Sequence, residues 1–259
     1  MKDIGINLYS LRNLISDEAG LLDTALKLRE MGYTNLQYSG GPYDPVMLSR
    51  VVKESGLPVV LTHVPLDRIL NDTDALMEEH DRFGCKNIGL GALGMNNLVE
   101  EKSRREIVEK LDVAAARMAE NGFSFYYHNH HHEFFRIGDS TILDYMIENA
   151  PHINFTFDTY WAQYGGVSVL EYIKKLTKRI GCVHLKDYRI EAQITDGKVT
   201  STFPTFAPVG YGNINFKVII PEMIKAGTKY FLVEQDNAAD LPDPLGEARL
   251  SVEYLKREF

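Results

Sequence analysis

Four histidines and one glutamate fall within six consecutive positions of this sequence, inside the segment FSFYYHNHHHEFFRI at residues 123–137. Imidazole and carboxylate side chains bind divalent metals and transfer protons near neutral pH. Such a cluster can equally be a solvated polar turn, and a lone histidine or aspartate at a strand end is often only a turn or capping residue. The choice between these interpretations depends on where the surrounding helices and strands place the side chains of the cluster.

Short apolar or aromatic runs alternate with longer amphipathic stretches along the chain. The eight runs that predict strands are 3–9, 35–39, 58–64, 87–92, 124–130, 154–159, 182–187 and 230–235. The stretches that predict helices, each ending at a glycine, are 21–32, 44–56, 104–122 and 168–181. Strand–helix units of about 32 residues, repeated eight times, predict an α/β fold with parallel strands, a closed (β/α)8 TIM barrel.

An open doubly wound sheet is the alternative arrangement of such units. The residues after the first predicted strand, YSLRNL, lack the glycine pattern GxGxxG, which argues against a dinucleotide-binding sheet. A length of 259 residues is normal for one barrel, so we expect a single domain over residues 1–259. The long connection at 188–215 is predicted to be a functional lid or a small hairpin.

The chain carries 28 lysines and arginines against 36 aspartates and glutamates, a formal net charge of −8. Nucleic acids require a basic surface, so they are poor candidate partners. Cys85 and Cys182 are far apart in sequence, so neither a disulfide framework nor a thiolate zinc motif is expected. The start MKDIGINLYSLR has no apolar signal core and no run of about 18 apolar residues exists, which predicts a cytoplasmic protein without a membrane span.

Polar side chains occur where the predicted strands end, and in a barrel these ends form the active face. The residues concerned are Tyr9, His63, His128, His130, Asp158, His184, Lys186 and Glu234. Side chains at i and i+2 of a strand share a face, so His128 points with His130 and His184 with Lys186. Three consecutive strands carry Asp158, His184 and Glu234, a set of side chains that suits a divalent metal such as Mn²⁺, Zn²⁺ or Fe²⁺.

The remaining histidines and the single tryptophan have less specific interpretations. His131 and His132 are expected to be solvated loop residues, and His80 and His152 are expected at the surface. Trp161 follows Asp158 by three residues in DTYWAQYGG. It could stack on the face of a sugar or serve ordinary packing, and the sequence leaves both open.

At these residues the sequence resembles the sugar phosphate isomerase/epimerase family of xylose isomerase-like TIM barrels, which includes inosose dehydratase-like proteins. The matching segments, in the family's order, are GINLYSLR, THVP, YYHNHHHEF, FTFDTYWAQYGG, VHLKDY, VGYGNINF and YFLVEQD. They span nearly the whole chain, and the ordered set is more specific than any one of them.

The resemblance implies a divalent metal held by Glu, Asp, His and Glu from consecutive late strands. Asp158, His184 and Glu234 match the last three positions. The first glutamate has no direct counterpart, because His128 occupies its place on the strand. Glu133, five residues later, is our prediction for the fourth ligand or a base, with His128 and His130 as the other options.

The chemistry that the resemblance implies is proton abstraction next to a carbonyl through an enediolate. The predicted catalytic residues are Glu133, Glu234, His63, His128 and Lys186. The predicted contacts with a small sugar substrate are Tyr9, His130, Trp161 and Lys186. No basic cluster marks a phosphate site, which favours an unphosphorylated sugar, and the sequence leaves room for a homo-oligomer.

Three functional hypotheses follow from the sequence. The first is a metal-dependent sugar or keto-sugar isomerase or epimerase, with an inosose or keto-sugar dehydratase or lyase as the variant on the same site. The second is a multi-zinc phosphodiesterase or abasic-site endonuclease on the same barrel, against which the acidic balance argues. The third is a barrel that binds a sugar without turning it over, which His128 at the place of a family glutamate keeps open.

Overall fold

Eight parallel strands close into a barrel in the computed structural model, which describes residues 3–259. In spatial order the strands are β1 (Gly5–Asn7), β12 (Tyr230–Val233), β9 (Cys182–Leu185), β8 (Asn154–Asp158), β5 (Ser124–His128), β4 (Asn87–Leu90), β3 (Val59–His63) and β2 (Asn35–Tyr38). The first strand pairs with both β2 and β12, so the sheet has no free edge. The predicted TIM barrel is confirmed, and the open sheet is excluded.

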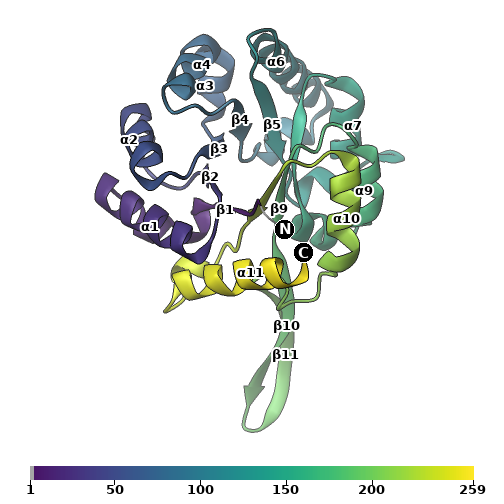
Figure 1. Ribbon diagram of the computed structural model, residues 1–259. Helices are drawn as coiled ribbons and strands as arrows, with labels where there is room; N and C mark the ends of the chain where they lie inside the picture. The colour runs from purple at the N-terminus through teal and green to yellow at the C-terminus, as the bar shows by residue number, and fades with distance from the viewer. Residues whose placement is uncertain (1–2) are drawn as a thin grey trace.

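Helices surround the barrel, as Figure 1 shows. The α-helices are α1 (Glu18–Met31), α2 (Pro45–Ser55), α3 (Leu66–Asn71), α4 (Thr73–Arg82), α5 (Met95–Leu98), α6 (Glu101–Glu120), α7 (Ile142–Asn149), α8 (Thr159–Tyr164), α9 (Val169–Lys175), α10 (Phe216–Ala226) and α11 (Pro244–Glu258). Short 3₁₀ segments are η1 (Leu8–Leu14), η2 (His132–Phe134) and η3 (Ala238–Asp240). No helix within residues 3–259 is long and apolar enough to cross a bilayer.

Local capping explains where several helices begin and end. The Asp17 side chain accepts a hydrogen bond from the backbone N–H of Gly20 at the start of α1, and Gly32, with φ of 96°, ends it. The predicted helices at 21–32, 44–56 and 104–122 correspond to α1, α2 and α6. The prediction for 168–181 was too long: α9 ends at Lys175, and Lys178 adopts a left-handed φ of 70° that a helix does not allow.

A two-stranded antiparallel hairpin projects away from the barrel, formed by β10 (Asp187–Thr195) and β11 (Lys198–Ala207) (Figure 1). It lies in the connection for which a lid or hairpin was predicted. Its base is fixed, because the Asp187 carboxylate accepts backbone hydrogen bonds from Gly210, Gly212 and Ile214. A second, minimal hairpin, β6 (Arg136–Ile137) with β7 (Ser140–Thr141), follows η2.

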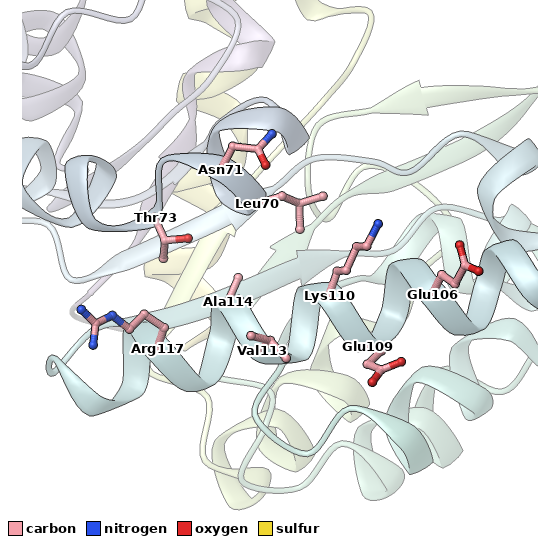
Figure 2. A pocket seen from close by; sticks show the side chains of 9 residues that line it. All are labelled: Leu70, Asn71, Thr73, Glu106, Glu109, Lys110, Val113, Ala114 and Arg117. Atoms are coloured by element: carbon pink, nitrogen blue, oxygen red, sulfur yellow. The ribbon is translucent and has the colours of Figure 1, made fainter.

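A hollow of about 850 Å³ lies on the outer surface between the end of α3 and α6 (Figure 2). Its lining combines aliphatic groups such as Leu70 and Val113 with charged side chains such as Lys110 and Arg117. None of the polar residues predicted for the strand ends lines this hollow. The polar side chains at the strand ends line a different cavity, at the barrel mouth.

The histidine predictions away from the barrel mouth have different outcomes. His152 is exposed, as predicted, and pairs with Asp112 at 2.8 Å. His80 was predicted at the surface, which is wrong: it lies on α4 and is fully buried. Its Nδ1–H donates to the Leu76 carbonyl at 2.7 Å, and its Nε2 accepts from the Thr62 hydroxyl at 2.7 Å. Cys85 and Cys182 are free thiols, as expected.

Burial lowers the pKa of His80 to about 4, so this imidazole stays neutral in the folded protein and charges on unfolding. The unfolded state then binds more protons between pH 4 and 6.5, and stability falls as the pH decreases through this range. We expect His80 to account for a loss of ~2–3 kcal/mol between pH 7.5 and 4.5. Urea unfolding of wild type and His80→Gln at both pH values measures it, and identical pH dependence in the two proteins would contradict it.

Candidate active site

Four buried side chains from four strand ends converge at the mouth of the barrel. His128 ends β5, Asp158 ends β8, His184 lies on β9 and Glu234 directly follows β12. Each offers one ligand atom, and these atoms all lie within 4.8 Å of one another. The structure therefore brings together Asp158, His184 and Glu234, the three residues that the sequence assigned to one cation, and adds His128 as the fourth member.

The two carboxylates of the group are held in the same manner. One oxygen of each is fixed by the protein: Asn7 Nδ2 donates to Glu234 Oε1 at 2.6 Å, and the backbone N–H of Trp161 donates to Asp158 Oδ1 at 2.9 Å. The other oxygens, Asp158 Oδ2 and Glu234 Oε2, face the two histidines. Each carboxylate is thus oriented by one oxygen and presents the other.

The two histidines are also oriented by hydrogen bonds on their far side. His128 Nδ1–H donates to the Gly91 carbonyl at 2.9 Å, which leaves Nε2 facing Asp158 Oδ2 at 3.3 Å. His184 Nε2–H donates to Gln37 Oε1 at 2.7 Å, which leaves Nδ1 facing Glu234 Oε2 at 2.7 Å. Outer hydrogen bonds of this kind fix the tautomer of a metal-binding histidine. Each ring therefore directs its other nitrogen toward the centre.

His184 Nδ1 and Glu234 Oε2 lie 2.7 Å apart but are not aligned as a hydrogen bond. Glu234 Oε2 is also ion-paired with Lys186, whereas His184 Nδ1 has no aligned hydrogen-bond partner within residues 3–259. Buried polar atoms without partners are rare and indicate an ion, a water or a ligand. Burial opposes charge on His184, but Glu234 and Asp158 outweigh it and raise its pKa to about 9. Burial likewise disfavours charge on Glu234, but His184 and Lys186 hold the pKa of this carboxyl well below its usual range.

Lys186 lies against the same carboxylates, with its Nζ 3.0 Å from Asp158 Oδ2 and 2.9 Å from Glu234 Oε2. A third carboxylate, Asp236, lies 3.0 Å from the same nitrogen. Burial alone would lower the pKa of Lys186, but the three carboxylates outweigh it and raise that pKa above its ordinary value. The ammonium is therefore charged and fully engaged by protein groups.

Glu133, predicted as fourth ligand or base, lies outside the group of four. Its Oε1 accepts from the Tyr127 hydroxyl at 2.6 Å, and its Oε2 accepts from the backbone N–H of His130 at 2.7 Å. These bonds hold the carboxylate under the loop that follows β5, where its nearby ligand atoms are those of His130 and His132. Burial raises the pKa of Glu133. His128, which was one of the other options for the fourth ligand, thus occupies the place in the group of four that was predicted for Glu133.

A cavity of about 370 Å³ opens over the group of four. The predicted residues Tyr9, His63 and His130 line it together with His128, Lys186 and Glu234. Trp161 is not among its lining residues and packs beside His130, with ring centroids 5.3 Å apart. His131 is exposed and His132 half-buried on the loop, as the sequence predicted.

Sequence reasoning missed the side chains that orient the site from β1 and β2. Asn7 holds Glu234, and Ser39 Oγ in turn donates to Asn7 Oδ1 at 2.6 Å. Gln37 bridges two histidines, accepting from His184 and lying 3.0 Å from His63 Nε2 through its amide nitrogen. Asn7 and Gln37 are polar residues inside apolar strands, and that is the signal that could have identified them.

The class defined by this fold and site is an α/β barrel with a polar centre at the carboxyl ends of its strands. The family described as xylose isomerase-like TIM barrel matches residues 27–258. The chain belongs to this family.

Individual relatives differ in the activities that their names state. An inosose dehydratase from Clostridium perfringens is 26% identical over 170 residues, which are 62% of this chain and 57% of that protein, so the match spans less than two thirds of the relative's length. A sugar phosphate isomerase/epimerase structure from Parabacteroides distasonis has a TM-score of 0.80 at 22% identity, covering 99% of this chain and 98% of that one. A Mycobacterium smegmatis barrel in complex with magnesium has a TM-score of 0.72 at 16% identity, covering 99% and 96%.

The hydrogen bond between Tyr127 and Glu133 should be important for stability, because both side chains are fully buried. Tyr127→Phe leaves a buried carboxylate oxygen without its donor, for which we expect a loss of ~1–3 kcal/mol. Chemical denaturation measures the loss, with Tyr164→Phe at an exposed ring as the control. A Tyr127→Phe protein as stable as this control would show that the bond contributes nothing.

Proposed function

We propose that this protein is a metal-dependent sugar or keto-sugar isomerase or epimerase that acts by proton abstraction next to a carbonyl. The observation that carries the proposal is the convergence of His128, Asp158, His184 and Glu234, each oriented by a hydrogen bond on its far side. Groups oriented in this manner are typical of a preorganised metal centre.

The residues present fit a divalent ion. Two imidazole nitrogens and two carboxylate oxygens suit Mn²⁺ or Zn²⁺, and His184 Nδ1, which lacks an aligned hydrogen bond, would gain a partner. The raised pKa of His184 means that this ring would give up a proton when the ion binds. Ionised Asp158, Glu234 and Asp236 against the Lys186 ammonium would then give a local charge of −2, which a divalent ion would neutralise. Once bound, the ion supplies Lewis-acid polarisation of a carbonyl oxygen.

The chain's own residues would bind the sugar and move the proton. His63 lines the cavity and is neutral, since burial holds its pKa well below the usual value. The Gln37 amide donates to His63 Nε2, so the neutral ring carries its proton on Nδ1 and would donate a hydrogen bond to the substrate. We therefore assign Glu234 as the candidate base. His130 and Tyr9 would contact substrate hydroxyls. Lys186 would donate a hydrogen bond to a carbonyl or hydroxyl oxygen after releasing one of its three carboxylates.

The cavity supports a small, unphosphorylated sugar as substrate. Its volume of about 370 Å³ lies at the lower end of the usual range for ligand sites. Among the described residues that line it, Lys186 is the only lysine or arginine, and it is already paired with three carboxylates. A phosphate would therefore meet no unpaired lysine or arginine in this lining and would face Glu234 and Asp236.

A dehydratase or lyase is the second candidate, favoured by the relatives named inosose dehydratase. It would share the first step, removal of a proton next to the carbonyl. It then expels a leaving group from the neighbouring carbon instead of returning the proton. The cytoplasmic location, a homo-oligomer and the absence of a nucleic-acid partner stay predictions.

The proposed reaction is tested by incubating the Mn²⁺-loaded protein in D₂O with a panel of ketoses and inososes. We expect deuterium to enter the carbon next to the carbonyl of an isomerised or epimerised sugar, whereas loss of water from an inosose would identify the dehydratase. Metal removal with EDTA should abolish both reactions. Sugar binding without exchange or product, in the metal-loaded protein, would instead support a barrel that only binds its ligand.

The fourth ligand is distinguished by paired variants. His128→Gln removes an imidazole that faces Asp158 at 3.3 Å. Loss of an outer hydrogen-bond partner alone weakens metal binding about 10- to 100-fold, so we expect loss of this imidazole to lower the Mn²⁺ affinity by at least about tenfold. Glu133→Gln keeps the shape of a side chain outside the group and should bind Mn²⁺ almost as wild type does. Isothermal titration calorimetry measures both, and the reverse order would return the assignment to Glu133.

A further inference from the structure

Lys186 lies where a cation would be expected to sit. Its side chain is 1% exposed, and its Nζ is 2.9–3.0 Å from carboxylate oxygens of Asp158, Glu234 and Asp236. Burying an unpaired carboxylate is costly, and two such groups facing each other repel. The ammonium therefore acts as a counter-charge that allows these carboxylates to lie together before a metal ion binds, and His184 in its protonated form adds to it.

The oxygens that contact Lys186 are the same atoms that face the histidines. Asp158 Oδ2 lies 3.0 Å from Lys186 Nζ and 3.3 Å from His128 Nε2. Glu234 Oε2 lies 2.9 Å from Lys186 Nζ and 2.7 Å from His184 Nδ1. A divalent ion and the ammonium would therefore share these two oxygens at short range, where their like charges repel.

Asp236 offers the ammonium a place outside the group of four. Its carboxylate belongs to the cavity lining, and its side chain is 23% exposed, against 0–4% for Asp158 and Glu234. The rings of Trp161 and Phe206 also lie within 5.3 and 5.9 Å of Nζ. Aromatic faces within about 6 Å stabilise an ammonium, so Lys186 keeps partners if it releases Asp158 and Glu234.

We propose that Lys186 is a resident cation of the metal centre: it keeps Asp158 and Glu234 in their binding arrangement before a divalent ion arrives, and it competes with that ion for their oxygens. This inference rests on the metal site of the proposed function and extends it. Lys186 is a positioning residue in this role. Its charge sets the affinity of the site for metal, because binding requires the ammonium to withdraw toward Asp236.

The test is the affinity for Mn²⁺, measured by isothermal titration calorimetry on the full chain, without reference to turnover. Lys186→Gln retains a polar group that can donate to the carboxylates but removes the charge. Two unit charges a few ångströms apart interact strongly enough at protein dielectric to change a binding constant by more than tenfold. We expect Lys186→Gln to bind Mn²⁺ at least about tenfold more tightly than wild type. The increase in melting temperature on adding Mn²⁺ should also be larger.

Two control variants separate the effect of the Lys186 charge on Mn²⁺ affinity from other effects of a substitution. Lys186→Arg keeps the charge and should bind Mn²⁺ no more tightly than wild type. Lys175→Gln breaks an exposed lysine–carboxylate pair, that of Lys175 with Asp144 at 2.8 Å, and should leave the affinity unchanged. Lys186→Met, of similar length and also uncharged, repeats the measurement if Lys186→Gln does not fold by circular dichroism.

The outcomes distinguish this inference from the proposed function. Equal or weaker Mn²⁺ binding by Lys186→Gln, with normal binding by wild type, overturns the inference and leaves the proposed function standing. Binding by the variant but not by wild type supports the inference and removes metal dependence from the proposed function. An absence of Mn²⁺ binding in both proteins overturns both.

Discussion

The mouth of the barrel places the buried Asp158 and Glu234 and the partly exposed Asp236 within 3.0 Å of one ammonium group. Charges removed from water are tolerated only when they are paired and hydrogen-bonded. Lys186 provides the pairing, and Asn7 and the backbone of Trp161 provide hydrogen bonds to the remaining oxygens. Every other property of the site depends on this arrangement, since a carboxylate without its partners would take up a proton and lose its capacity to hold a cation.

Closure of the barrel is the condition that makes this pairing possible. Gln37 on β2 hydrogen-bonds His184 on β9, although 147 residues separate them and β1 and β12 lie between their strands. Asn7 on β1 donates to Glu234, which directly follows β12, and the pairing of β1 with β12 is the one that joins the first strand of the chain to the last. In an open sheet β1 and β2 could not lie opposite the late strands. The closure of the barrel thus supplies, from the first strands of the chain, the outer hydrogen bonds that orient His184 and Glu234 on the last strands.

Periodicity and composition were sufficient to predict the barrel and the convergence of Asp158, His184 and Glu234, because the ends of parallel strands must meet. Periodicity and composition did not identify Asn7 and Gln37 as residues that orient the site. Strands buried on both faces show no alternation that separates inward-facing from outward-facing residues. His80 was misplaced for a related reason. Its partner Thr62 lies on β3, and a helical pattern does not reveal which polar residue finds a buried partner on another element.

The position of His128 follows from strand parity, whereas the prediction for Glu133 relied on the family pattern alone. His128 is the last residue of β5 and pairs in register with Thr156 of the neighbouring strand, two residues before Asp158. Its side chain is therefore carried into the group by the sheet itself. Glu133 follows a turn and is held there by Tyr127 and the backbone of His130.

His128 and Lys186 are connected through the charge of the site. Asp158, Glu234, Asp236 and Lys186 together carry a net charge of −2 when the histidines are neutral. A carboxylate in place of His128 would make this net charge −3. Burial lowers the pKa of His128, which favours that neutral form. With an imidazole at this position, the barrel mouth can hold the Lys186 ammonium and still carry a net negative charge that one divalent ion would neutralise. The buried lysine thus gives a physical reason for an imidazole at the place where the resemblance implied a glutamate.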